Sequence, residues 1–134
     1  MSNPDAVLPG TTASAIASAT VQLLREYTGR GPTKARAYIS EDLISVVLQD
    51  TLTMGEKSLV RDGHASLVLA TRKAFQETMG PQLIAVVEQH SGRSVHAFLS
   101  DNHIDPDVAI ECFVLAPRTN GEPDPERANA EAPI

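Results

Sequence analysis

Apolar and polar positions alternate along residues 108–115, with the period of two that a β-strand requires. We expect this strand to pair with the preceding residues from Ser91 onward as a hairpin that closes the folded part of the chain. Neither face is purely polar, so we expect helices on one face and another cover, such as a second copy of the chain, on the other. The faces are Val108, Ile110, Cys112 and Val114 against Ala109, Glu111, Phe113 and Leu115.

The N-terminal part follows a helical pattern from Thr12 to Tyr27. Thr12 or Ser14 could cap its start, and Gly29 is placed to end it, because Gly adopts the left-handed conformation at little cost. The predicted inward face consists of Ile16, Thr20, Leu23, Leu24 and Tyr27.

Two strands should follow as a hairpin. Pro32 cannot continue a helix, so a turn leads to a short strand at Arg36–Ile39. The run Leu43–Gln49 has the strongest strand pattern of the chain. Turn-forming residues lie between the two strands at Ser40, Glu41 and Asp42.

Residues 54–90 are helical in pattern, starting after a capping box formed by Thr53 and Glu56. A straight helix of that length would measure roughly 55 Å, which exceeds a small domain. The helical region must therefore break, and Gly63 and the pair Gly80-Pro81, where a proline either kinks one helix or separates two, are the candidate positions. We expect the region to end at Ser91-Gly92. The predicted buried face comprises Leu67, Thr71, Phe75 and Met79, continued by Leu83, Val86, Val87 and His90.

These elements predict an α+β domain over residues 12–116, with tails at residues 1–11 and 117–134 that we expect to be disordered. The order is α-(ββ)-α-α-(ββ), giving a three- or four-stranded antiparallel sheet with helices packed on one face. So small a sheet leaves a face or an edge uncovered. We therefore expect a homo-oligomer, with a dimer favoured.

Composition excludes several classes of protein. The net charge of −6 and the 4% of aromatic residues argue against nucleic-acid binding. The only cysteine, Cys112, allows no intramolecular disulfide, and we expect it to be a small buried apolar residue. We find no signal peptide and no apolar run of membrane-spanning length, so we expect a soluble cytoplasmic protein.

Five sequence segments together resemble the MpsC-like family of small bacterial proteins, over about residues 15–116. That family is described as a component of a Na+-translocating, membrane-potential-generating system. The resemblance implies a role beside a membrane process, which this chain would serve as an accessory with a membrane-protein partner. It implies no catalytic residues. The segments are GRGP (29–32), LTMGE (52–56), TRKAF (71–75), SGRSVHAFLSD (91–101) and DPDVAIECFVL (105–115).

A glycine-rich basic loop is the first candidate site. Its cations and free backbone N–H groups could bind a phosphate or carboxylate, in a pocket where its basic residues meet Arg72 or Arg93. The alternative is a helix end followed by a hairpin start, with the charges in solvent or paired with acids. The loop residues are Gly29, Arg30, Gly31, Pro32, Lys34 and Arg36.

A row of oxygen and imidazole ligands is the second candidate. Asp101, His103, Asp105 and Asp107 recur at every second residue and could hold a divalent cation. The spacing lacks the Gly and Glu of a calcium-binding EF loop. The alternative is that these residues form the turn between two strands.

The sequence offers general bases but no catalytic motif. We therefore predict no catalytic residues and no cofactor, and a non-enzymatic accessory or regulatory binding protein. A small-ligand or anion sensor using the loop from Gly29 to Arg36 is the alternative, and an enzyme is the second alternative. The bases weighed were His64, His90, His96 and His103, with Glu56 and Glu111 as carboxylates.

Overall fold

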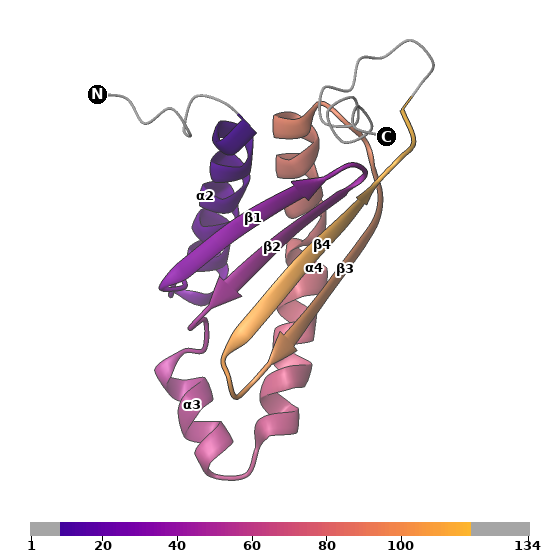
Figure 1. Ribbon diagram of the computed structural model, residues 1–134. Helices are drawn as coiled ribbons and strands as arrows, with labels where there is room; N and C mark the ends of the chain where they lie inside the picture. The colour runs from indigo at the N-terminus through magenta and orange to yellow at the C-terminus, as the bar shows by residue number, and fades with distance from the viewer. Residues whose placement is uncertain (1–8, 119–134) are drawn as a thin grey trace, which may run out of the picture.

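The computed structural model describes residues 9–118 of the 134-residue chain, and the ends of both predicted tails, residues 1–8 and 119–134, lie outside this part (Figure 1). It confirms the predicted α+β class and the order α-(ββ)-α-α-(ββ). The elements are α2 (Pro9–Thr28), β1 (Lys34–Ser40), β2 (Leu43–Gln49), α3 (Met54–Arg61), α4 (Ala65–Ser91), β3 (Val95–His103) and β4 (Val108–Leu115).

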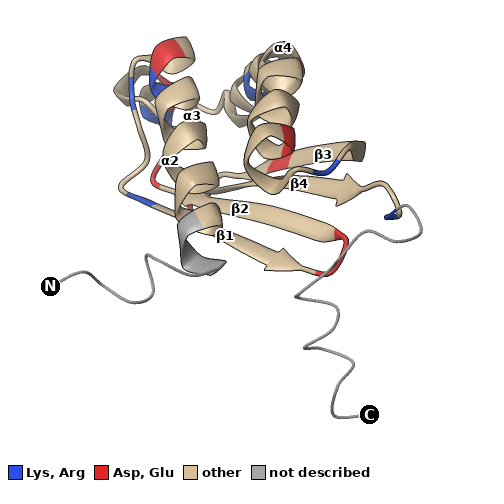
Figure 2. Cartoon of the chain, turned by 90° about the horizontal axis from the view of Figure 1, so that it is seen from above, with Lys and Arg blue, Asp and Glu red and all other residues tan. Residues whose placement is uncertain are grey.

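The two hairpins join into one four-stranded sheet of order β1-β2-β4-β3, with every neighbouring pair antiparallel. The hairpins meet where β2 pairs with β4, with Ile44 opposite Phe113. Helices α2 and α4 both cover the same face of this sheet (Figure 2). Within residues 9–118 no helix covers the other face, which we call the open face. The strand order makes β1 and β3 the two edge strands of the sheet.

The core lies between the sheet and the two long helices. Along β4 the residues alternate as predicted, and Phe113 and Leu115 point to the helices. Side chains from α2, β2 and α4 complete this layer, and their removal from water supplies most of the driving force for folding. Its most deeply buried members include Ile16, Ile44, Val46, Leu48, Met79, Leu83, Val87 and Phe113.

Helix α2 starts at Pro9 rather than Thr12, so the predicted caps at Thr12 and Ser14 are wrong. Proline suits the first turn of a helix, because its missing N–H is not needed there. The inward face is as predicted, and its buried Thr20 hydroxyl donates to the Ile16 carbonyl at 2.8 Å. Gly29 follows the helix with φ +79°, as expected of a left-handed residue at a helix end.

The first strand extends to Lys34 and Ser40, beyond the predicted Arg36–Ile39. Its full length pairs with β2, from Lys34 opposite Gln49 to Ser40 opposite Leu43. The partner strand therefore set its ends, which the local sequence leaves open. The turn is narrower than predicted, with Glu41 at φ +50°.

Of the two candidate positions for a break, the structure has a break at Gly63, which has φ +88°, and none at Gly80-Pro81. Helix α4 continues through Pro81. An interior proline costs a helix about 3 kcal/mol. Met79 before it and Leu83 after it are both buried against the same sheet, so tertiary packing outweighs that cost.

The buried face of α4 also differs from prediction in its first half and at its last position, where His90 is exposed. Leu67 is 53% exposed, while Val68, Arg72 and Gln76 are buried. The prediction from apolar spacing failed here because the buried face of α4 carries two polar side chains, Arg72 and Gln76, and a search for apolar residues does not detect them. Those two polar residues belong to the network described below.

Candidate functional site

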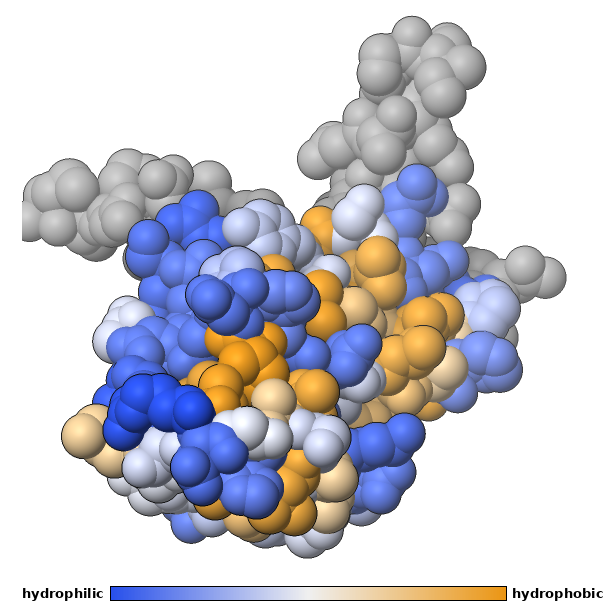
Figure 3. Space-filling view, turned by 90° about the horizontal axis from the view of Figure 1, so that it is seen from below, coloured by the Kyte–Doolittle hydropathy of each residue, from blue (hydrophilic) through white to orange (hydrophobic). Residues whose placement is uncertain are grey.

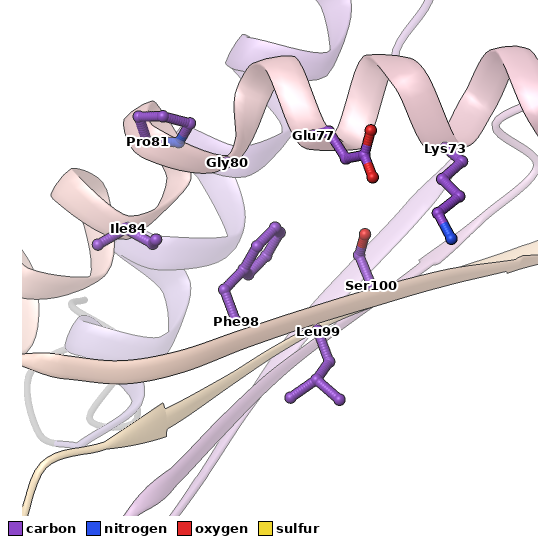
Figure 4. A pocket seen from close by; sticks show the side chains of 8 residues that line it. All are labelled: Lys73, Glu77, Gly80, Pro81, Ile84, Phe98, Leu99 and Ser100. Carbon is purple, nitrogen blue, oxygen red and sulfur yellow. The ribbon is translucent and has the colours of Figure 1, made fainter.

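A groove of about 480 Å³ lies between α4 and the edge strand β3 (Figure 4). In Figure 4 the helix forms one wall, and Phe98 and Ser100 rise toward it from the strand while Leu99 points to the opposite face of the sheet. The lining residues are Lys73, Glu77, Gly80, Pro81, Ile84, Phe98, Leu99 and Ser100.

The inner half of the groove is apolar. The Phe98 ring packs on Phe113 of the core, with ring centroids 5.1 Å apart. A Cβ atom on Gly80 would lie 3.4 Å from the Phe98 ring. Glycine at this position therefore lets the helix backbone lie close to the ring, and Pro81 and Ile84 extend the apolar wall.

The other end of the groove is charged. Lys73 and Glu77 lie one helical turn apart on α4, and Figure 4 shows their side chains on the side of Ser100. Both α4 residues are exposed, so their charges are solvated and available to a ligand. The groove thus offers an apolar surface beside one positive and one negative charge.

The backbone of β3 has a free edge beside this groove. Among the described strands, β3 pairs with β4 alone. An unpaired edge presents N–H and C=O groups in the spacing that another extended chain can bind. A register shift between Val95 and Ala97 interrupts the strand only at its start, so the stretch from Phe98 onward keeps regular pairing.

A buried polar network lies behind the groove. The Glu111 carboxylate on β4 is 3% exposed and accepts a hydrogen bond of 3.1 Å from the Gln76 amide. The Gln76 carbonyl oxygen accepts one of 2.7 Å from Asn102 on β3. One carboxylate oxygen, Oε1 of Glu111, is buried without a hydrogen-bond partner. Together these contacts connect α4 to both strands of the second hairpin.

Burial raises the pKa of Glu111 to about 7, although hydrogen bonds from the Gln76 amide and from Ser100, and the positive charge of Arg72, act in the opposite direction. The adjoining cavity measures only about 10 Å³ and is lined by Gln76, Arg72 and Glu111 among others. That volume holds at most about one water molecule. The network therefore stabilises the fold and does not form a ligand pocket, while its carboxyl group titrates near neutral pH.

Arg72 anchors the start of α4. Its guanidinium binds Glu56 in a two-point contact, Nε to Oε2 at 3.0 Å and Nη2 to Oε1 at 2.8 Å, and also donates to the Thr51 hydroxyl at 3.0 Å. Burial by itself would raise the pKa of Glu56. Hydrogen bonds from Arg72 and from the Thr53 backbone outweigh burial and lower that pKa.

The predicted capping box is confirmed and is part of the same contact. The Thr53 N–H donates to Glu56 at 2.8 Å, and the Glu56 N–H donates to the Thr53 hydroxyl at 3.1 Å. Glu56 therefore caps α3 and neutralises Arg72 of α4 at once. One carboxylate joins two helices to the loop that follows β2.

The residues of the predicted anion loop are spread over two environments. The Arg30 guanidinium contacts the Asp50 carboxylate at 2.7 Å, while Lys34 and Arg36 are exposed on β1. The arginines expected to join them are held by other carboxylates, Arg72 by Glu56 and Arg93 by Asp42, each within 2.8 Å. Gly29 ends α2, and a Cβ on Gly31 would lie 2.9 Å from the Arg25 guanidinium.

The predicted metal ligands do not converge: Asp101 and His103 lie at the end of β3, and Asp105 and Asp107 lie in the β3–β4 turn. Asp107 accepts hydrogen bonds from the Thr51 hydroxyl at 3.2 Å and the Leu52 N–H at 3.0 Å, and Asp101 accepts from the Asn102 N–H. His103 Nδ1 lies 2.8 Å from the Pro106 carbonyl. Asp105 precedes Pro106 in the turn. Within residues 9–118 no three acidic, histidine or cysteine side chains gather to hold a metal ion.

The four histidines weighed as general bases do not line the groove. All four histidines are exposed, at the α3–α4 turn, the end of α4 and the two ends of β3. Cys112, expected to be buried, is half-buried on the open face of the sheet, and burial raises the pKa of its thiol.

A second apolar surface lies at the end of the molecule formed by α3 and the start of α4. Figure 3, seen from this end, shows apolar residues exposed among hydrophilic ones. Met54 is 80% exposed and Leu67 is 53% exposed. Helix α3 buries none of its side chains, so this end depends on the Arg72–Glu56 contact for its position.

Sequence reasoning missed the groove. Its residues come from two elements, α4 and β3, and only the tertiary structure brings them together. One signal was present, the glycine at position 80 in a stretch that is otherwise typical of a helix, because such a glycine often marks a close approach.

The fold is thus an α+β domain whose sheet is covered by helices on one face and open on the other. Its groove lies between a helix and a strand, beside the free edge of that strand. The chain belongs to the MpsC family, described as a Na+-translocating membrane potential-generating system, whose profile matches residues 9–117. No curated protein and no solved structure matches the chain. In the described part of the chain, no helix is both long and apolar enough to cross a membrane.

Proposed function

We propose that this protein is a non-enzymatic, cytoplasmic accessory of a Na+-dependent membrane-potential-generating system, and that it binds an extended segment of a protein partner in the groove between α4 and β3. The observation that carries the proposal is the position of the groove beside an unpaired strand edge. The family description supplies the membrane system.

The groove has the parts that strand addition needs. Backbone groups of β3 from Phe98 onward would pair with the partner segment, which supplies affinity without sequence preference. An apolar side chain of that segment would enter the groove against Phe98, Pro81 and Ile84. Lys73 and Glu77 would select flanking residues of opposite charge, so specificity would come from the helix wall.

The anion-sensor alternative has less support. Its central cation, Arg30, is already held by Asp50, and Lys34 and Arg36 lie along a strand rather than around a cavity. The groove, by contrast, has both volume and a free edge.

Site-specific photocrosslinking in the native cell tests the proposal. A photoreactive residue at Ile84, inside the groove, should crosslink to a protein of a sodium-translocating membrane system, and Gly80→Leu should abolish the crosslink by filling the space beside Phe98. The purified partner should then bind the purified protein, and the Gly80→Leu substitution should weaken that binding. The control Tyr38→Ala, on the open sheet face, should leave binding unchanged.

Two results would contradict the proposal. Crosslinking from Leu67 but not from Ile84 would move the partner to the apolar end formed by α3 and α4. Binding that survives Gly80→Leu in a variant with an unchanged melting temperature would exclude the groove as the site.

A further inference from the structure

The open face of the sheet has an apolar centre. Side chains that point away from the helices include Tyr38, Leu43 and Leu99, which are 53%, 41% and 57% exposed. Half-buried apolar side chains on β2 and β4 lie between them. The outward apolar residues are Tyr38, Leu43, Val47, Ala97, Leu99, Val108, Ile110, Cys112 and Val114. One polar residue of β2, Ser45, lies among them, and an apolar surface of this kind is a mark of an interaction site.

Opposite charges flank this centre on the two edge strands. Arg36 on β1 and Asp101 on β3 are both exposed. The register places them in one row across the sheet, because Arg36 pairs with Val47, Val47 with Ile110, and Ile110 with Asp101. Each charge therefore lies one strand beyond the apolar pair Val47 and Ile110, on opposite sides.

We propose that the open face binds the open face of a second copy about a two-fold axis that runs along the strands, between β2 and β4. Such a rotation keeps positions along the strands and exchanges the two edges, so β1 of one copy lies over β3 of the other. Arg36 then faces the partner's Asp101, and Asp101 faces the partner's Arg36. The proposal does not depend on the groove, which lies on the helix side of β3.

The arrangement fits the rules for packed sheets. Two sheets that pack face to face keep their strands within about 30° of each other at a spacing of about 10 Å. An isologous interface needs one surface that is complementary to itself. An apolar centre on the axis, with opposite charges at matched positions on either side, meets that requirement.

Size places the dimer at the weak end of specific complexes. Every second residue of four strands gives about 16 outward residues from each copy, compared with about 20–30 a side in interfaces of standard size. We therefore expect monomers and dimers to exchange at micromolar concentrations. The self-complementary charges favour a second copy over an unrelated protein, which would need no such symmetry.

Sedimentation velocity of the full chain, over a range of micromolar concentrations, tests the proposal. The wild-type protein should shift from monomer to dimer. Arg36→Asp and Asp101→Arg should each raise the dissociation constant by about tenfold or more, because each reversal places two like-charged pairs in the interface. The double variant, Arg36→Asp with Asp101→Arg, should restore the dimer. The control Arg61→Glu, an exposed position on α3 outside the open face, should have no effect.

The thiol of Cys112 gives an independent reading, because it lies half-buried on the same face. Its alkylation should slow as the protein concentration rises. A chain that stays monomeric throughout, or a dimer insensitive to both charge reversals, would overturn the proposal. So would a double variant that stays monomeric while its melting temperature matches the wild type. Protection of Cys112 that does not change with concentration would show instead that another segment of the same chain covers the face.

Discussion

The Gln76 amide on α4 donates a hydrogen bond of 3.1 Å to the buried Glu111 carboxylate on β4. Because Gln76 also accepts from Asn102 on β3, one helix residue binds both strands of the second hairpin. This contact fixes the distance between α4 and β3, which form the two walls of the groove. A carboxyl group that titrates near neutral pH thus lies in the support of the candidate site.

Glu111 should make stability depend on pH between about 4.5 and 7. Its pKa in the folded state, about 7, lies above its ordinary value of 4.5, so the folded state holds the proton more tightly. The stabilising contribution is complete below about pH 4.5 and is lost as pH rises through 7. Relative to wild type, Glu111→Gln should therefore gain up to about 3 kcal/mol in unfolding free energy between pH 4 and pH 8.

Urea unfolding of both proteins across this pH range measures that difference. Taking the difference removes the contributions of other carboxylates. Glu77→Gln, an exposed position on α4, is the matched control and should show no such trend. A difference that stays constant with pH would show that Glu111 titrates alike in the folded and unfolded chains.

Arg72→Met should destabilise the fold by about 3 kcal/mol, because it leaves the half-buried Glu56 and the Thr51 hydroxyl without their partner. Arg72→Lys should cost nearly as much, since an ammonium cannot make the two-point contact. Chemical denaturation measures both changes.

Adding Glu56→Gln to Arg72→Met should recover part of the loss, giving a coupling energy in the double-mutant cycle. Arg61→Met, exposed on α3, should change stability by less than about 0.5 kcal/mol. Additive effects of the Glu56 and Arg72 substitutions would contradict a direct interaction.

Asp107→Ala should lower the unfolding free energy by about 1–3 kcal/mol, because the Leu52 N–H and the Thr51 hydroxyl lose their acceptor. Asp101→Ala should have a small effect, since the exposed Asp101 side chain accepts only from the N–H of the adjacent Asn102 among the described residues. Thermal melts with added Ca²⁺, Mg²⁺ or Mn²⁺ should match the metal-free melt. A metal-induced rise in melting temperature that requires both Asp101 and Asp107 would support a metal site instead.

Arg30→Ala should lower stability only slightly, because its contact with Asp50 is partly exposed and screened by water. Lys34→Ala and Arg36→Ala should each cost less than about 0.5 kcal/mol. Calorimetric titration with phosphate should show no binding. Binding to wild type that Arg36→Ala abolishes without changing the melting temperature would support the anion-sensor function instead.

Local patterns were sufficient for most of the fold. The strand Leu43–Gln49, the capping box of Thr53 and Glu56, and the helix ends at Gly29 and Gly92 all appear where the sequence places them. Each depends on groups within a few residues, such as a hydroxyl three residues from an N–H or a glycine free to take positive φ.

Residues whose surroundings come from distant segments were predicted less well. Leu67 resembled a core residue by spacing, yet Arg72 and Gln76 occupy the buried face because their partners, Glu56 and Glu111, come from other elements. A polar side chain is stable in a core only when such partners exist, and sequence spacing does not reveal them.

The sequence by itself determined the α+β class, the order of elements, the alternation of β4 and membership of the MpsC family. Only the tertiary structure decided that α4 runs unbroken through Pro81, that Glu111 is buried beside Gln76, and that α4 and β3 enclose a groove. The physical reason is range. Hydrophobic periodicity and helix capping depend on residues within one or two turns of each other. Whether a helix tolerates a proline, what pKa a buried carboxyl group has and how large a groove is depend on atoms from segments far apart in the chain.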